Sequence, residues 1–348
     1  MQMDMDKLLH FAFQNKASDL HITIDTTPIV RINGKLKKIG SHILTREETT
    51  AMAKQITSDQ QYQQFDQSGE LDFSYALEDI CRFRVNIYRQ RGAVGIVCRV
   101  INSSIPTLTD LKLPAVMEQF AKKTQGLLLV TGPTGSGKST TLAALIDYIN
   151  ENMSKHILTL EDPIEYLHEH KKSIINQREI GLDSKGFSVG LRAALRQDPD
   201  VILVGEMRDL DTVQTAITAA ETGHLVLGTL HTQTASQTVH RIIDVFPAEQ
   251  HQQVRMQIAS SLVGVVSQRL LPTANDQGRM AALEILVNNA AIGNLIRSDK
   301  IHQILTVLET SKHAGMQTIN MSVVDLVQKG LVTRAVADEF VPGWDKHE

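Results

Sequence analysis

The stretch GLLLVTGPTGSGKSTTLAALIDYI, residues 126–149, decides the fold that we expect for this chain. It opens with an apolar run that is typical of a buried strand and closes with a pattern that predicts an amphipathic helix. Between them lies G-x-x-x-x-G-K-S, from Gly132 through Gly137 and Lys138 to Ser139. A strand, a glycine-rich loop of this spacing and a helix form the phosphate-binding loop of proteins that bind nucleoside triphosphates. The alternative, an ordinary glycine-rich turn, does not account for this context.

The residue types of the loop suit a triphosphate with its metal ion. Glycines let the backbone curl so that its N–H groups face the phosphates, and the helix N-terminus adds the positive end of its dipole. We expect Lys138 to reach the β- and γ-phosphates and the Ser139 hydroxyl to hold Mg²⁺. The expected nucleotide-binding residues are Gly132, Pro133, Thr134, Gly135, Ser136, Gly137, Lys138, Ser139 and Thr140.

Carboxylates follow two further apolar runs that read as strands. Glu206 follows VILVG (residues 201–205); an aspartate is more usual there, so we expect Glu206 to act on Mg²⁺ through a bound water. An acidic cluster that includes Glu165 follows HILTL, residues 156–160. Hydrolysis requires a group that orients the attacking water, and we expect Glu165 to be this general base. The alternative for the acidic cluster is a solvated first helical turn.

Two histidines bracket a further apolar run, LVLGTL, residues 225–230. In a doubly wound sheet, ligands lie at the C-terminal ends of the strands, so His231 falls on the same edge as the phosphate-binding loop and His224 on the opposite edge. An extended strand of this length separates them by about 20 Å, which excludes a shared metal ion. We expect His231 to act as a sensor near the γ-phosphate or the acidic cluster. For both residues the alternative is an ordinary histidine at a strand end.

The pattern of apolar runs predicts an α/β protein. After residue 125, short apolar runs alternate with helical stretches, as in a parallel sheet covered on both faces. Residues 1–101 read as an α+β domain, residues 102–125 as a linker with two prolines. We expect the P-loop core over residues 126–271 and a mainly helical region over residues 272–348.

Composition excludes several classes of protein. Hydrophobic residues make up 42% of the 348-residue chain, which is typical of a soluble globular protein. The net charge of −4 and the 4% of aromatic residues argue against a nucleic-acid translocase. The chain has two cysteines, no signal-peptide pattern and no long apolar run. These features favour a cytosolic protein that, if it works at a membrane, is peripheral and does not span it.

Four motifs in order resemble those of the secretion ATPases, the motors of type II and type IV secretion and of type IV pili. GPTGSGKST resembles their Walker A motif, LTLEDPIE their Asp box, LRQDPDVILVGEMRD their Walker B motif and AETGHLVLGTLHT their His box. ASDLHITIDTTPIVRINGKL resembles the start of their N-terminal, PAS-like domain. The resemblance covers nearly the whole chain.

Within this family the chain is most similar to the motors that retract type IV pili. It begins almost directly at the PAS-like domain, and no cysteine follows Cys98, so the four-cysteine insert of many extension and secretion motors is absent. AAIGNLIRSDK, residues 290–300, resembles the retraction signature. It departs from that signature at Gly293, where the family has Arg, and at Ser298, where it has Glu.

The resemblance implies a PAS-like domain, a RecA-like ATPase domain with a helical C-terminal region, and a homohexamer. It implies that ATP and Mg²⁺ are used, with Glu165 as the general base and Glu206 at the metal and its water. It places His224 and His231 in the nucleotide and intersubunit region, and it implies that arginines of the N-terminal domain reach a γ-phosphate. The matching candidates are Arg82, Arg84 and Arg99.

The family also implies a location and a task. It implies a peripheral motor at the inner face of the cytoplasmic membrane that drives an inner-membrane pilus platform protein, without direct binding of DNA or RNA. The leading interpretation is therefore a cytosolic motor for pilus retraction and twitching motility. Three alternatives remain: a pilus extension or type II secretion motor, a nucleic-acid translocase, and a regulatory subunit with a vestigial nucleotide site.

Overall fold

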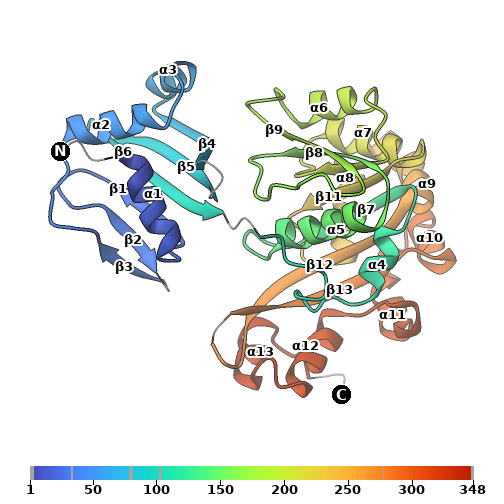
Figure 1. Ribbon diagram of the computed structural model, residues 1–348. Helices are drawn as coiled ribbons and strands as arrows, with labels where there is room; N and C mark the ends of the chain where they lie inside the picture. The colour runs from blue at the N-terminus through green and yellow to red at the C-terminus, as the bar shows by residue number, and fades with distance from the viewer. Residues whose placement is uncertain (1–3, 33, 78–80, 102–103, 277, 346–348) are drawn as a thin grey trace. The chain divides into compact units, whose positions relative to one another are not determined.

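The computed structural model describes residues 4–32, 34–77, 81–101, 104–276 and 278–345. They form two compact units (Figure 1). The first is Met1–Ser104 together with Pro163–Leu167, and the second is Ile105–Asp162 together with His168–Glu348. The fold is α/β, as the sequence predicts.

The first unit is an antiparallel sheet whose apolar face is covered by helices. The sheet has the order β3-β2-β1-β6-β5-β4. Its strands are β1 (Asp19–Ile22), β2 (Ile29–Ile32), β3 (Lys35–Lys38), β4 (Glu70–Leu77), β5 (Cys81–Gln90) and β6 (Ala93–Ile101). Helices α1 (Met5–Gln14), α2 (Arg46–Gln55) and α3 (Asp59–Ser68) bury their apolar residues in one core with these strands.

Alternation along β5 sorts its side chains between the two faces of this sheet. Phe83, Val85 and Ile87 are fully buried in the core. Arg82 and Arg84 lie on the other face and are half-buried. Successive side chains of a strand point to opposite faces, so β5 has one apolar face in the core and one polar face outside it.

The second unit is a seven-stranded sheet of order β13-β12-β7-β11-β10-β8-β9. Its strands are β7 (Gly126–Thr131), β8 (His156–Glu161), β9 (Ile174–Glu179), β10 (Val201–Val204), β11 (Leu225–Leu230), β12 (Leu262–Pro272) and β13 (Arg279–Val287). Every pairing from β12 to β9 is parallel, and β13 pairs with β12 antiparallel. The parallel strands end at one edge, where ligands bind in such sheets.

Helices cover both faces of this sheet, which is why its strands are apolar throughout. Helices α4 (Val116–Ala121) and α5 (Lys138–Asn152) share one core with the strands. Helices on the other face share a second core with the strands. They are α6 (Phe187–Ala194), α7 (Leu210–Glu221), α8 (Ala235–Asp244), α9 (His251–Ser261), α10 (Ala290–Arg297) and α11 (Ile304–Thr310). Three short 3₁₀ helices are η1 (Ala248–Gln250), η2 (Ile301–Gln303) and η3 (Lys312–Ala314). Helices α12 (Ile319–Gln328) and α13 (Arg334–Phe340) pack around Trp344 against the C-terminal end of β12 and the first half of β13 (Figure 1).

The structure corrects two parts of the expected organisation. The region from residue 272, expected to be mainly helical, begins with strand β13, which extends the core sheet. Its apolar run AALEILV is buried between helices and a neighbouring strand, and an apolar run of this kind has no period that distinguishes a strand from a helix. The expected linker over residues 102–125 contains α4, whose Met117 and Phe120 are buried in the core; residues 102 and 103 lie outside the described part.

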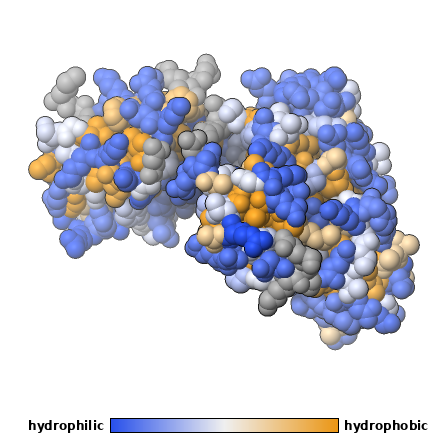
Figure 2. All heavy atoms as spheres, turned by 90° about the horizontal axis from the view of Figure 1, so that it is seen from below, coloured by the Kyte–Doolittle hydropathy of each residue, from blue (hydrophilic) through white to orange (hydrophobic). Residues whose placement is uncertain are grey.

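The surface mixes apolar and hydrophilic side chains on both units (Figure 2). Among the described residues, large apolar side chains exposed to solvent include Leu36, Ile43 and Leu182. No helix in the described ranges is both long and apolar enough to cross a bilayer.

Candidate nucleotide-binding site

The phosphate-binding loop joins β7 to α5 in a conformation that only glycine tolerates at its key positions. Gly132, Gly135 and Gly137 have φ angles of 142°, 78° and 86°. A Cβ atom on Gly132 would lie 2.3 Å from the carbonyl oxygen of Gln268. The loop therefore needs glycine for its backbone angles and for close packing, as the spacing of the motif predicts.

The loop presents donors suited to an anion. Gly137 is the N-cap of the 15-residue helix α5, so the free N–H groups of its first turn adjoin the loop. The Lys138 ammonium donates to the carbonyl oxygens of Gly132 at 2.9 Å and Pro133 at 3.2 Å, folded over the loop. The Ser136 hydroxyl is buried and has no hydrogen-bond partner among the described residues. A phosphate chain fits this arrangement of a glycine-rich loop, a helix N-terminus and a lysine.

The predicted carboxylate and histidine meet at the same edge of the sheet. Glu206 follows β10 and His231 follows β11, the strand between β10 and β7. The His231 Nε2 lies 2.8 Å from a Glu206 carboxylate oxygen. The Arg208 guanidinium also donates to Glu206, and this hydrogen bond raises the pKa of Arg208. Glu206 thus lies between an arginine and an imidazole, a contact that sequence spacing did not specify.

The loop after His231 is anchored by a carboxylate that the sequence reasoning missed. Glu284, in β13, is buried and accepts a hydrogen bond of 2.7 Å from the backbone N–H of Ala235, the first residue of α8. Burial raises the pKa of the Glu284 carboxyl. Arg269, in β12, donates to the side chain of Gln233 at 3.0 Å in the same loop. Strands β12 and β13 therefore hold the segment that carries His231.

His224 lies at the opposite edge, at the start of β11. Its Nδ1 is 3.0 Å from the carbonyl oxygen of Ala219, near the end of α7. The backbone N–H of His224 donates to the same oxygen at 3.2 Å. The structure does not bring His224 close to Glu206 or His231. The His224 ring is instead hydrogen-bonded to a carbonyl group near the C-terminus of α7.

Glu165 lies in the loop between β8 and β9, in the segment Pro163–Leu167. Its side chain is half-buried, and Pro163 and Ile164 before it are buried. At the start of the loop, the Glu161 carboxylate accepts hydrogen bonds from the Thr159 hydroxyl at 2.6 Å and the Gln177 amide at 3.1 Å. The acidic cluster is thus built into the fold and is not a solvated first helical turn.

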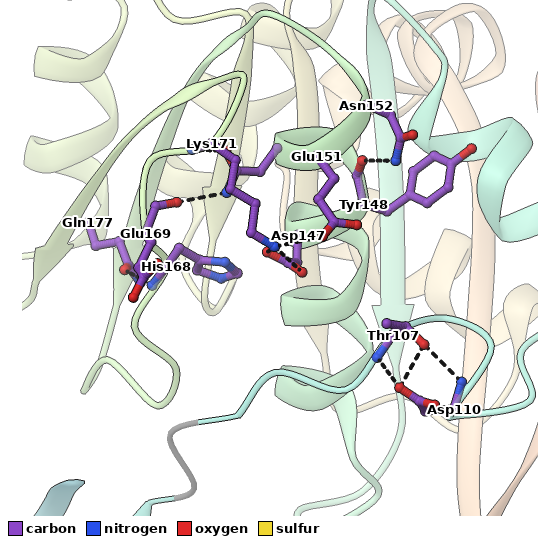
Figure 3. Close-up of polar contacts among 11 residues, drawn as sticks. Thr107, Asp110, Asp147, Tyr148, Glu151, Asn152, His168, Glu169, Lys171 and Gln177 are labelled. Atoms are coloured by element: carbon purple, nitrogen blue, oxygen red, sulfur yellow. Dashed lines mark hydrogen bonds and ion pairs between the residues drawn. The ribbon is translucent and has the colours of Figure 1, made fainter. Parts of the chain in front are cut away.

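The end of this loop is anchored to α5, the helix that begins at the phosphate-binding loop (Figure 3). The fully buried Asn150 donates to the carbonyl oxygen of Glu169 at 2.8 Å and accepts from the backbone N–H of Lys171 at 3.1 Å. The Lys171 ammonium binds Asp147 at 2.8 Å and Glu151 at 2.9 Å, and the hydrogen bond to Asp147 raises the pKa of Lys171. One helix therefore supports both the phosphate-binding loop and the loop that carries Glu165.

The three candidate arginines share the open face of the sheet in the first unit. Arg84 of β5 is directly opposite Arg99 of β6, and Arg99 is opposite Asp19 of β1. The Arg99 Nε donates to Asp19 at 3.2 Å, and Arg31 lies 3.8 Å from the same carboxylate. Arg82 lies two residues before Arg84 on the same face. Asp19 is a counter-ion that sequence reasoning did not identify.

Two side chains at this edge of the sheet are of the kind that holds Mg²⁺ together with a nucleotide. Within the described residues, no group of three or more histidine, cysteine, aspartate or glutamate side chains is arranged to hold a metal ion. Mg²⁺ with nucleoside triphosphates is commonly held by one or two side chains together with phosphates and water. Ser139, exposed at the start of α5, and Glu206 fit that requirement.

A parallel sheet with a phosphate-binding loop after β7, a histidine after β11 and a carboxylate after β10 at the same edge defines a RecA-like P-loop ATPase. Residues 1–337 match the family of type II/IV secretion system proteins, and the chain belongs to that family. The chain is 47% identical to the type IV pilus retraction ATPase PilT of Pseudomonas aeruginosa over 337 residues, covering 97% of this chain and 98% of that protein. It is 49% identical to the twitching motility protein of Neisseria gonorrhoeae, covering 89% and 83%. The crystal structure of the pilus retraction motor PilT with bound ADP superposes with a TM-score of 0.91 at 46% identity, covering 97% of this chain and 96% of that one.

Proposed function

We propose that this chain is an ATP-hydrolysing motor that powers retraction of type IV pili and so twitching motility. The observation that supports this proposal most strongly is the 47% identity to a retraction ATPase along nearly the full length of both chains. The phosphate-binding loop and the carboxylates beside it supply the chemistry that such a motor needs. The intact Lys138, Ser139, Glu165 and Glu206 argue against a vestigial nucleotide site.

ATP binds with its phosphates in the loop from Gly132 to Thr140. The N–H groups of the loop and of the first turn of α5 donate to the phosphate oxygens. The Lys138 ammonium exchanges the carbonyl oxygens of Gly132 and Pro133 for the β- and γ-phosphates. Ser139 and Glu206 would hold Mg²⁺, Glu206 through water, and the bound ion would supply positive charge against the phosphates.

Hydrolysis requires a base and a means of detecting its outcome. Glu165 accepts the proton of the attacking water as the general base. His231 is hydrogen-bonded to Glu206 at 2.8 Å, so a change of charge near the Glu206 carboxylate would change the hydrogen bond that the imidazole makes. Neutral imidazole either accepts or donates a hydrogen bond, which suits a sensor of phosphate release.

Assembly supplies the remaining groups. The chain forms a homohexamer in the cytoplasm, at the inner face of the membrane, and acts on the pilus platform protein of the inner membrane. Arg82, Arg84 and Arg99 supply positive charge for a γ-phosphate, and Arg99 must exchange Asp19 for that phosphate. His224 lies at the N-terminal end of β11, where it contacts a neighbouring subunit of the ring. The His224→Ala variant should still assemble into rings, and its ATPase activity and twitching should fall together.

The retraction signature lies on α10. Gly293 is buried against α9, where a Cβ atom would lie 3.3 Å from the carbonyl oxygen of Ala259 and 3.4 Å from the guanidinium of Arg297. Ser298 is the C-cap of α10, and its hydroxyl donates to the carbonyl oxygen of Asn294. The two departures from the signature therefore keep the helix intact and change side chains at its surface and its packing with α9.

The direction of force is tested in cells that lack the gene. A retraction motor predicts more surface pili and lost twitching, and complementation with the wild-type gene restores both. Cells without pili would instead mean that the motor drives extension. Complementation with Lys138→Ala is the control, because it separates loss of hydrolysis from loss of the protein.

A further inference from the structure

A buried glutamine contacts the phosphate-binding loop from the neighbouring strand, and the hydrolytic scheme does not use it. Gln268 lies in β12, next to Ser267, which is paired with the last residue of β7, Thr131. Its side chain is 3% exposed. A polar amide at such a position requires partners for both of its ends, because an unpaired buried polar group is costly.

Both ends of the Gln268 amide are bound to the machinery of the loop. Its Oε1 accepts a hydrogen bond of 2.8 Å from the hydroxyl of Thr141, in the first turn of α5. Its Nε2 donates to the carbonyl oxygen of Ser136 at 2.7 Å, within the loop. One side chain therefore bridges the loop and the helix that follows it.

Gln268 also packs against the two glycines that bound the loop. A Cβ atom on Gly132 would lie 2.3 Å from the Gln268 carbonyl oxygen, and a Cβ atom on Gly137 would lie 2.8 Å from its Nε2. Contact this close leaves the loop no room to sink toward β12. The backbone and the side chain of Gln268 thus form a floor beneath the loop.

The hydrogen bond to Ser136 determines where the next N–H group points. A trans peptide is planar, so its C=O and its N–H point in opposite directions. Because the Ser136 carbonyl is bound to the buried Gln268, the N–H of Gly137 in the same peptide is directed away from β12. Gly137 is the N-cap of α5, where backbone N–H groups bind phosphates.

We propose that Gln268 is a positioning residue of the phosphate-binding loop, which orients the Ser136–Gly137 peptide so that its N–H faces a nucleotide phosphate. The inference rests on the proposed nucleotide-binding function of this loop. Glutamine suits the role because it offers a donor and an acceptor in one uncharged group. A glutamate would keep the acceptor for Thr141 but, when ionised, has no proton for the Ser136 carbonyl.

The loss of Gln268 should weaken binding of phosphates in the ground state and the transition state alike. Gln268→Met, of similar length, removes both hydrogen bonds and lets the peptide rotate. We expect the dissociation constant for Mg-ADP to rise about 10- to 100-fold, which is the range for one or two lost buried hydrogen bonds. The KM for ATP should rise with it, while kcat changes less than about threefold, because uniform binding is lost.

The test is isothermal titration of the full-length protein with Mg-ADP, alongside its thermal midpoint and its ATPase kinetics. Thr141→Val tests the same bridge from the other side, because it removes the hydroxyl that binds Gln268 at little cost in shape; its dissociation constant should also rise. The double variant should bind Mg-ADP no more weakly than the single variant with the lower affinity, since both substitutions break the same hydrogen-bonded bridge. If Gln268→Met fails to fold, Thr141→Val decides the question by itself.

Gln317→Met is the matched control. The Gln317 amide also donates to a backbone carbonyl, that of Leu283 at 2.9 Å, but it lies between β13 and α12. We expect a lower thermal midpoint with an unchanged affinity for Mg-ADP. An affinity for Mg-ADP within twofold of wild type in both Gln268→Met and Thr141→Val would overturn the inference. An equal loss of affinity in Gln317→Met would overturn it as well, since the effect would then be one of general stability. Failure of the wild-type protein to bind Mg-ADP would instead count against the proposed function.

Discussion

Asn150 should be a main determinant of the stability of the second unit, because it anchors the loop between β8 and β9 to α5. It is 0% exposed, donates to the carbonyl oxygen of Glu169 at 2.8 Å and accepts from the N–H of Lys171 at 3.1 Å. Asn150→Ala removes both hydrogen bonds and leaves two backbone groups without their partner. Each such bond contributes about 1 kcal/mol, and Glu169 and Lys171 are exposed, so water can reach the backbone groups left behind; we expect a loss of about 2 kcal/mol.

Asn152→Ala is the control for this change (Figure 3). Asn152 lies two residues later on α5, is exposed, and donates only to the carbonyl oxygen of Tyr148 in its own helix, at 2.8 Å, among the contacts described. Both variants gain the same helix propensity of alanine, so their difference isolates the buried contacts. We expect Asn152→Ala to stay within about 0.5 kcal/mol of wild type.

The assay is urea unfolding followed by far-UV circular dichroism, with the ATPase rate as a second readout. The rate should fall in Asn150→Ala at unchanged affinity for Mg-ADP, since the anchored loop carries Glu165. If the free energy of unfolding of Asn150→Ala is less than about 1 kcal/mol below that of Asn152→Ala, the two hydrogen bonds do not anchor the loop.

Four further predictions concern the site and its pH dependence. Lys138→Ala should abolish Mg-ATP hydrolysis, because no other cation in the loop reaches the β- and γ-phosphates; turnover within twofold of wild type in a phosphate-release assay would contradict this. Glu165→Gln should bind nucleotide normally but hydrolyse it about 10²- to 10⁴-fold more slowly, as expected on removal of a general base, and normal turnover would place the base elsewhere. His231→Ala should bind ATP nearly as well as wild type and hydrolyse it poorly, because the hydrogen bond to Glu206 is lost; equal rates would return His231 to a packing role. Burial lowers the pKa of His168 to about 4, so the unfolded chain takes up a proton between about pH 6.5 and pH 4 that the folded chain does not. Stability should therefore fall by up to about 3 kcal/mol as the pH drops through this range, and urea midpoints of wild type and His168→Phe should diverge there; parallel pH profiles would contradict it.

The phosphate-binding loop was predictable from the sequence because its determinants are local. Glycines at positions 132, 135 and 137 permit the positive φ angles, and the strand and helix on either side are set by apolar patterning. The edge that carries His231 was predictable for a general reason. Parallel strands with helical crossovers all end on one side of the sheet, so the residue after each strand belongs to the same edge.

Strands β12 and β13 were not predictable in the same way. LVGVVSQRLLP and RMAALEILV are covered on both faces, so neither shows the alternation that identifies a strand, and the second was expected to be helical. The pairing of β12 with β7 depends on contacts between segments more than 100 residues apart, as in the pair Ser267 and Thr131, and β13 joins the sheet only through β12. A polar SQR within an apolar run was the only local signal that β12 reaches the site.

The sequence by itself determined the conformation of the glycine-rich loop and the edge of the sheet that carries it and His231, because backbone angles and strand direction are local properties. Only the tertiary structure decided which side chains support them. Four side chains are joined to partners that lie far away along the chain: Gln268 beneath the loop, Asn150 at the Glu169 carbonyl, Glu284 at the start of α8 and Asp19 beside Arg99. Such contacts leave no periodic trace in the sequence, because a buried hydrogen bond requires two polar groups at one point in space and sets no spacing between them along the chain.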